Sequence, residues 1–345
     1  MCIRDSYGTS VDLSGPVVRT AAVAADTDTG GVRFSVRGLD PGTAYHYAVE
    51  VEGVLDLARL GRVRTFSSAP DSVTLAFASC ARTGSNAEVF ETIRRAGPDL
   101  FLMTGDLHYA DIAENRLADY VQAYDTQLGR PAPQALYLST PAVYMWDDHD
   151  YGPDDADRLT RSRPAALASY RSLGAHYPLA LPGPDAPVAQ AFSIGGVRVI
   201  VTDLRSGRDP SSAPDDESKS MMGTEQRAWF ERELVQASRT HDAVVWVSSV
   251  PWIVGTESPG DSWGAYSAER SSLARLIAEQ QIDNLVMVAG DAHMLAADDG
   301  SHNDYAGPGE PGFPVLQAAA LDRPGSLKGG PSSQGTHPGA GQFGL

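Results

Sequence analysis

Acidic and imidazole side chains crowd the end of one apolar stretch of the chain. Residues 142–146 are apolar and read as a strand, and they are followed directly by Asp147, Asp148, His149 and Asp150. The ends of strands, where turns begin, are where α/β proteins place their chemistry. In that setting Asp148 can ligate a hard cation, His149 can carry a proton, and Asp150 can orient the imidazole. The alternative is an acidic turn that carries a solvated histidine.

Three other apolar stretches also end in a thiol or a carboxylate. Cys80 follows residues 73–79, Asp106 follows residues 99–104, and Asp291 follows residues 285–289. Strands of one parallel sheet end at the same edge, so we expect these groups to converge on one point. Tyr109 lies three residues beyond Asp106 and His293 lies two beyond Asp291, which is close enough to reach the same place.

The side chains at these ends sort into two kinds of ligand. A thiolate, a phenolate and an imidazole, supplied by Cys80, Tyr109 and His293, suit a transition metal and favour ferric iron over zinc. Carboxylates such as Asp148 and Asp291 suit calcium, magnesium or manganese. Taken singly, each residue also has an ordinary structural role, as a buried thiol, a rim aromatic or a turn cap.

Asp106 is placed where it could bridge two ions. Two metal ions about 3.5–4 Å apart can clamp a phosphate, lower the pKa of a bound water to about 7 and stabilise an in-line displacement. His149 would then protonate the leaving oxygen. The pattern therefore predicts a two-metal centre that acts on a small phosphate ester.

Composition limits the partners of the chain. The 345 residues carry a net charge of −17, and the pI is about 4.8. This charge argues against a nucleic-acid-binding face, and no apolar run approaches the roughly 20 residues of a membrane span. An anionic substrate would need positive charge from metal ions or a few arginines. We expect a monomer. The two cysteines indicate no disulfide framework. No signal peptide is visible, and both ends look incomplete.

Residues 1–68 read as a first domain made of β-structure. Residues 32–36 and 44–51 alternate between apolar and polar side chains, and a Pro-Gly turn separates them. The pattern around this turn resembles the end of a fibronectin type III-like sandwich. Such a sandwich has about 100 residues, so we expect its first strands to be missing and residues 1–6 to belong to no element. A spacer or lid is favoured over a binding module.

Residues 72–345 read as a second domain in which strands alternate with helices, after a linker at residues 67–71. We expect strands at 73–79, 99–104, 142–146, 244–247, 285–289 and 314–320, with a hairpin at 192–201. Helices are expected at 86–95, 114–127, 161–176, 224–238 and 267–280. The tail from residue 325 is rich in glycine, serine and proline and reads as loop.

Several of these motifs together resemble a known family. Gly105-Asp-Leu-His-Tyr109 resembles the Gly-Asp-x-x-Tyr motif of purple acid phosphatases, a branch of the calcineurin-like metallophosphoesterases. Trp146-Asp-Asp-His-Asp150 resembles the Gly-Asn-His-(Asp/Glu) block of that superfamily. Five blocks in order, at 77–80, 146–149, 202–205, 261–266 and 290–293, resemble the alkaline phosphatase D family over most of residues 72–322.

The resemblance implies a four-layer αββα core, an extracytoplasmic protein, and hydrolysis of phosphomonoesters and phosphodiesters with ferric iron and calcium. Carried onto this chain, it implies iron ligands Cys80, Asp106, Tyr109 and His293, calcium ligands Asp106, Asp148 and Asp291, His149 as the acid with Asp150 as its partner, and Arg205 as a phosphate contact. Arg205 could instead pair with Asp203.

Two departures from the wider pattern leave the metals open. Asp148 stands where the superfamily has a neutral Asn, and Ser248-Ser-Val-Pro-Trp252 lacks the histidine usual in that block. Zinc, manganese and magnesium therefore remain alternatives. The leading hypothesis is a metal-dependent phosphoesterase. The alternatives are a phospholipase D-type diesterase on the same scaffold and a non-catalytic binding or adhesion protein. We expect His108 to point away from the metals, as a second-shell or solvated side chain.

Overall fold

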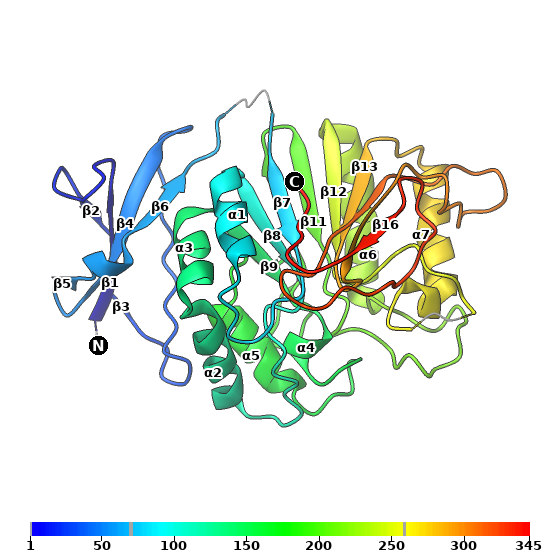
Figure 1. Ribbon diagram of the computed structural model, residues 1–345, viewed down its shortest axis with the longest axis horizontal. Coiled ribbons are helices and arrows are strands. Elements are labelled where there is room, and N and C mark those ends of the chain that lie inside the picture. Colours follow the sequence, from blue (N-terminus) through cyan, green and yellow to red (C-terminus); the bar gives the residue numbers. More distant parts are fainter. Residues whose placement is uncertain (1, 69–71, 258–259) are drawn as a thin grey trace.

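The computed structural model describes residues 2–68, 72–257 and 260–345 of the chain. Its N-terminal part is one antiparallel sheet of six strands, seen at the far left of Figure 1. The strands are β1 (Cys2–Gly8), β2 (Val18–Arg19), β3 (Val23–Ala24), β4 (Ala44–Val51), β5 (Val54–Leu55) and β6 (Gly61–Arg64), with a short 3₁₀ turn at Leu57–Arg59. The described residues of this part form a single sheet, so a fibronectin-like sandwich is not confirmed.

Two expectations for the N-terminal part were wrong. The first residues, which matched no element, form β1 and pair with β4 along most of its length. Residues 32–36 are not a strand, although they alternate. The Arg33 side chain donates instead to the carbonyl of Gly174 at 2.7 Å. This segment is therefore held by a side-chain contact with the core and not by pairing with a neighbouring strand. Tyr47 also donates to Leu138 O at 3.3 Å, which ties β4 to the core. The predicted domain boundary, between residues 68 and 72, contains residues 69–71, which lie outside the described residues. The division into two domains stays a prediction.

The core holds two sheets side by side. The first consists of three parallel strands, β7 (Leu75–Ala78), β8 (Leu100–Thr104) and β9 (Ala142–Met145). The second has the order β10-β11-β12-β13-β15-β14-β16, with β10 (Gln190–Ile194), β11 (Val197–Val201), β12 (Ala243–Ser248), β13 (Leu285–Ala289), β14 (Met294–Asp298), β15 (Val315–Gln317) and β16 (Thr336–Pro338). The run β11-β12-β13-β15 is parallel, whereas β10, β14 and β16 are antiparallel to their neighbours.

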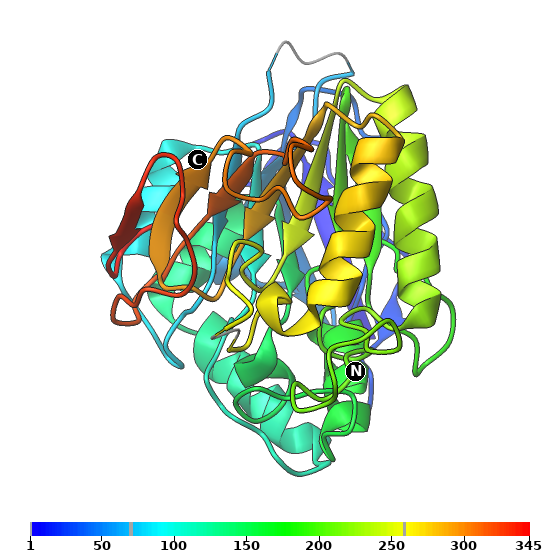
Figure 2. The same cartoon turned by 90° about the vertical axis from the view of Figure 1, so that its right-hand side faces the viewer.

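Helices cover the outer faces of both sheets, which gives a four-layer mixed α/β core (Figure 1). Beside the three-stranded sheet lie α1 (Glu88–Ala96), α2 (Leu117–Leu128), α3 (Pro131–Ser139) and α5 (Arg163–Leu173). Figure 2 shows α6 (Thr224–Thr240) and α7 (Ser267–Glu279) side by side over the second sheet, with the 3₁₀ turn Trp263–Tyr266 leading into α7. None of the described helices is both long and apolar enough to cross a membrane.

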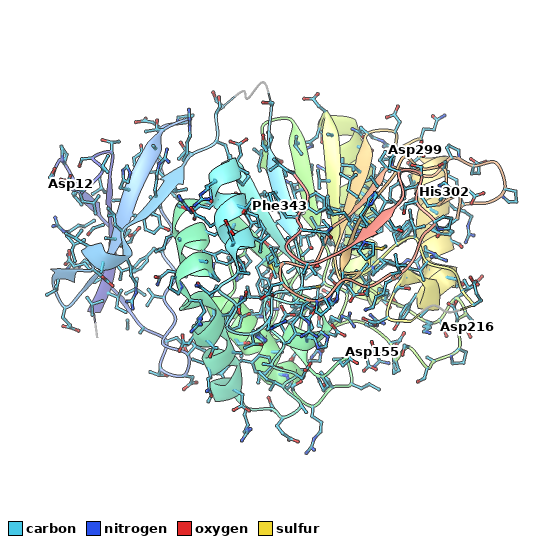
Figure 3. The ribbon with its side chains drawn as sticks, in the orientation of Figure 1. Asp12, Asp155, Asp216, Asp299, His302 and Phe343 are labelled. Atoms are coloured by element: carbon cyan, nitrogen blue, oxygen red, sulfur yellow. The ribbon has the colours of Figure 1, made fainter. Side chains whose placement is uncertain are left out.

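The expected strands and helices of the core are present, and four further elements were not anticipated. Helix α3 begins with two prolines in its first turn, where the missing N–H groups cost nothing. Helix α4 (Asp148–Tyr151) occupies the acidic motif itself, and strands β14 and β16 form in and before the tail. The tail is more ordered than its composition suggests, because Gly344 exchanges both backbone hydrogen bonds with Phe77. Phe343, labelled in Figure 3, packs against the apolar core there.

Candidate metal centre

The carboxyl ends of strands from both sheets meet at one place. Cys80 follows β7, Asp106 follows β8, and Asp291 follows β13. Hydrogen bonds from backbone amides join these ends, because Cys80 N donates to Gly105 O at 3.1 Å and Asp291 N donates to Ser79 Oγ, directly after β7, at 3.1 Å. The convergence that the sequence predicted is therefore what the fold produces.

Four of the predicted ligands hold a backbone conformation that costs energy. Cys80, Asp106, Asp291 and His293 have φ values of 63°, 55°, 66° and 51°, in the left-handed region that side chains other than glycine seldom adopt. Such strain persists only where the surrounding structure enforces it, and it gathers at functional sites. The turn at Gly290 is equally tight, since a Cβ there would lie 2.6 Å from Thr104 O.

The thiol, phenol and imidazole form one side of the centre. Tyr109 Oη lies 3.1 Å from His293 Nε2, and Cys80 Sγ lies 3.5 Å from Asp106 Oδ2. Burial raises the pKa of the Cys80 thiol and of the Tyr109 phenol, and Asp106 raises both further. Burial, together with the nearby Lys328 ammonium, lowers the pKa of His293 to about 4. In the metal-free protein this soft side is accordingly neutral.

Carboxylates form the other side. Asp106, Asp147 and Asp291 offer oxygen atoms within 4.8 Å of one another, and so do Asp106, Asp148 and His149 through an oxygen or ring nitrogen. Sequence reasoning missed Asp147 as a possible ligand because the Asp-His pair directly after it already matched a ligand and a proton donor. On this hard side, burial and mutual repulsion raise the pKa of Asp106 and Asp147 well above the usual range, and that of Asp291 to about 6.

The hard side fits bound cations. Asp106 Oδ1 and Asp147 Oδ2 are buried and have no hydrogen-bond partner in the described structure. Buried carboxylates without partners are costly, and a coordinated cation removes that cost. Hard oxygen donors here and thiol, phenol and imidazole donors beside them match two different metals, as the ligand types predicted. The individual ligand assignments stay predictions.

His149 lies between carboxylates at the edge of the centre. Its Nδ1 is 2.5 Å from Asp111 Oδ1 and its Nε2 is 3.4 Å from Asp154 Oδ1. Its ring lies tilted against that of Tyr109, with the ring centroids 4.0 Å apart. Burial opposes the charged ring, but Asp148 and Asp111 outweigh it, and the pKa of His149 is raised. Asp154 and Asp155 form with Asp148 a further group of oxygens; Figure 3 shows Asp155 on the loop after α4.

The expectation that Asp150 orients His149 is corrected by the structure. Asp150 accepts hydrogen bonds from Leu107 N at 2.8 Å, Tyr144 Oη at 2.6 Å and Asp147 N at 2.6 Å. The prediction rested on the adjacency of the two residues in the sequence, but they lie in helix α4, in which consecutive side chains point about 100° apart. Asp150 thus braces the two ligand-bearing turns, and Asp111 is the carboxylate that contacts the imidazole. Burial raises the pKa of Asp150 to about 7.

The expected phosphate contact of Arg205 is not supported by its position. Arg205 is fully buried behind the carboxylates, where its Nε donates to Asp147 Oδ1 at 2.6 Å and its Nη2 donates to Asp261. Its backbone N–H donates to Asp203 Oδ1, which is close to the alternative that the sequence left open. Arg205 holds Asp147 in place and compensates part of the buried negative charge.

Positive charge reaches the front of the centre from the tail. Lys328 Nζ lies 2.7 and 2.9 Å from the two oxygens of Asp291, and the guanidinium of Arg323 lies 4.1 Å above the Tyr109 ring. Sequence reasoning missed both because the tail reads as loop. His108 is buried and not solvated; its ring packs edge-on against Tyr124, and burial lowers its pKa to about 3.

With this geometry described, comparison with known proteins is decisive. A sequence profile of the PhoD-like phosphatase family matches residues 75–317. The chain belongs to the PhoD-like phosphatase family. It is 24% identical over 310 residues to alkaline phosphatase D of Bacillus subtilis (strain 168), an alignment that covers 76% of this chain and 53% of that protein. The chain thus spans about half the length of the curated relative that it matches.

Solved structures agree on the fold of this PhoD-like chain. A structure of PhoD superimposes with a TM-score of 0.78 at 21% identity, covering 92% of this chain and 70% of that one. The purple acid phosphatase PPD1 from yellow lupin (Lupinus luteus) seeds superimposes with a TM-score of 0.61 at 12% identity, covering 97% and 62%. Both likenesses confirm a mixed α/β fold that this chain shares with PhoD and with that purple acid phosphatase.

Proposed function

We propose that this PhoD-like phosphatase hydrolyses phosphate esters, monoesters and diesters, at a centre that holds two metal ions. The observation that carries the proposal is the cluster of buried carboxylates, with unpartnered oxygens on Asp106 and Asp147, beside a histidine held between carboxylates. Such a cluster needs cations, and a proton donor at its edge suits ester cleavage. An extracytoplasmic location goes with this proposal.

Two overlapping sets of residues would hold the two ions. We assign ferric iron to Cys80, Asp106, Tyr109 and His293, and calcium to Asp106, Asp148 and Asp291, with Asp147 as an added candidate. When bound, the ions would supply Lewis acidity and a water of lowered pKa. Zinc, manganese or magnesium are the alternatives for the same donors.

The chain itself handles the proton. Asp111 accepts from Nδ1 of His149, which fixes the tautomer and directs Nε2 outward from that contact. The raised pKa of His149 keeps its ring protonated to higher pH than an ordinary histidine, which suits a general acid for the leaving oxygen. Asp150 holds the turns of Asp106 and Asp147 together through Leu107 N and Asp147 N.

The test is hydrolysis of an aryl phosphate monoester and a matched diester by the pure protein with iron and calcium supplied. We expect turnover, and His149→Ala should lower it by roughly 10²–10⁴-fold while metal content stays unchanged. Asp111→Asn should reproduce part of that loss, more for an alkyl than an aryl leaving group, because an alkoxide needs the proton more. The exposed His337 provides the matched control, and His337→Ala should retain activity.

The outcomes separate the rival functions. Turnover of diesters alone would favour a phospholipase D-type diesterase. Bound metal without turnover on either substrate would contradict the proposal in favour of a non-catalytic binding or adhesion protein. Loss of metal in His149→Ala would make His149 a ligand and not the acid.

A further inference from the structure

Lysine is scarce in this chain, and one of its lysines lies in the metal centre. The sequence has 27 basic residues, of which two are lysines, at positions 219 and 328, leaving 25 arginines. Lys219 donates to two backbone carbonyls, Ser211 O and Ala265 O. Lys328 contacts Asp291, a predicted ligand. At position 328, next to a predicted metal ligand, this chain therefore has a flexible ammonium, whereas almost all its other basic residues are arginines.

The backbone on both sides of Lys328 is fixed. Ser326 N donates to His293 O at 3.2 Å, and Ser326 Oγ donates to Ala292 O at 3.0 Å. After the lysine, Gly330 N donates to Ile253 O at 2.8 Å, and a Cβ at Gly329 would lie 2.4 Å from that same carbonyl. The segment is therefore held against the turn that carries Asp291 and His293, and only the Lys328 side chain has freedom to change partners.

The Lys328 ammonium occupies the oxygens that a cation would need. Its Nζ contacts both Oδ1 and Oδ2 of Asp291, at 2.7 and 2.9 Å, and the side chain is 47% exposed. A divalent or trivalent cation on Asp291 would repel an ammonium at this distance. A cation bound to Asp291 therefore requires Lys328 to leave, and its exposure gives it room to do so.

An ammonium displaced from Asp291 would find the neighbouring carboxylates engaged, because Asp106 and Asp148 would hold the bound cations. Asp261 is already paired with Arg205 and Arg208, and Asp147 is held by Arg205 and Ser249. A substrate phosphate at the centre would be the anion in need of charge, since Arg205 lies buried behind the carboxylates.

We propose that Lys328 exchanges partners, holding Asp291 in the cation-free protein and turning to the phosphate oxygens of the substrate once a cation occupies Asp291. The phosphate half of this exchange rests on the proposed function; the cation half does not. Lysine suits the exchange because its ammonium is a point charge on four rotatable bonds. Arginine, with a planar fork that clasps carboxylates bidentately, would resist release.

Calorimetric titration of the metal-free protein with Ca²⁺, and separately with Mn²⁺, tests the cation half. Lys328→Met should bind the cation roughly tenfold more tightly than the parent, because no competing ammonium must be displaced. Lys328→Arg should bind it more weakly than the parent. Arg161→Met is the charge-matched control, since its exposed side chain forms an ion pair with Glu114 and its loss should leave cation affinity within about twofold. Circular dichroism and thermal unfolding check that each variant folds.

Titration of the metal-loaded proteins with inorganic phosphate tests the other half. Here Lys328→Met should bind phosphate roughly tenfold more weakly, a change opposite in sign to its gain for the cation. A purely structural lysine would lower both affinities, and a spectator would change neither; either result overturns the proposal. If Lys328→Met is unstable, Lys328→Gln replaces it with the same expected signs. If neither the parent protein nor any variant hydrolyses a phosphate ester, the proposed function fails. The calcium and manganese titrations still test whether Lys328 must leave Asp291 when a cation binds.

Discussion

The two sides of the metal centre differ in how their buried side chains are accommodated in the metal-free protein. On the soft side, Cys80, Tyr109 and His293 can all be neutral, because burial raises the pKa of the thiol and the phenol and lowers that of the imidazole. On the hard side, Asp106 and Asp147 have burial and repulsion acting against their charge, and oxygens without partners.

The difference indicates what each side requires. The soft side is a stable hydrogen-bonded group on its own, and a metal there must displace protons from the thiol and the phenol. The hard side already depends on cations, since Arg205 holds Asp147 and Lys328 holds Asp291. Metal binding should therefore matter for stability mainly on the hard side and for protons mainly on the soft side.

Asp106→Asn should have the largest effect, because Asp106 belongs to both sides. Its carboxylate contacts Cys80 and offers an oxygen within 4.8 Å of oxygens of Asp147 and Asp291. Altering a residue that only supports a ligand typically lowers metal affinity 10–100-fold, so loss of a shared ligand should exceed about 100-fold for both ions. Elemental analysis after dialysis, with the hydrolysis assay, measures this. Retention of one ion at full occupancy would show that Asp106 does not bridge.

Tyr109→Phe should separate the two sides. If Tyr109 binds ferric iron as a phenolate, the pure protein is coloured by charge transfer, and the variant should lose that visible absorption entirely. Its calcium content should stay unchanged, because Tyr109 is not a predicted calcium ligand. It contacts Cys80, His293 and the shared Asp106, and the variant keeps the carboxylate of Asp106. Visible spectroscopy and metal analysis on the same samples provide the comparison. An active parent protein that is colourless and free of iron would remove the assignment.

The ligand-bearing parts of the centre could be predicted because they follow strands. Cys80, Asp106 and Asp291 stand directly after apolar runs, and parallel strands end at a shared edge, so their meeting follows from the sheet. The core strands and helices followed from the same periodicity. Sequence alone gave no register for residues that come from connections, where no period constrains direction.

The failures have that common cause. Asp150 was assigned to His149 because the two are neighbours in the sequence, yet in helix α4 their side chains point in different directions. Arg205 was predicted to contact the substrate phosphate, although the turn after β11 buries it behind the carboxylates. Lys328 went unnoticed in a segment whose composition indicates only loop, but whose position is set by hydrogen bonds to residues some 35 positions earlier, such as Ser326 to Ala292.

Stability against pH offers the finest test of the hard side, through Asp150. Its pKa is raised from 3.8 to about 7 in the folded protein, so the folded state holds this proton where the unfolded chain has lost it. Stability from this group is complete below about pH 4 and is lost as pH rises through about 7. The metal-free protein should therefore become easier to unfold between these values, with a slope of up to about 1.4 kcal/mol per pH unit from Asp150.

Urea unfolding of the metal-free protein at several pH values measures that slope. Asp150→Asn should make the slope shallower because the amide does not titrate, and the contribution of Asp106, Asp147 and Asp291, whose pKa values are also raised, should remain. Tyr144→Phe is the matched control: it removes one hydrogen bond to Asp150 at 2.6 Å but keeps the carboxyl, so the slope should remain. Added calcium should stabilise the parent more at pH 8 than at pH 5, where protons already neutralise Asp291, whose pKa is about 6. Equal stabilisation at both values would place the bound cation away from these carboxylates, and the contrast between the two sides of the centre would not hold.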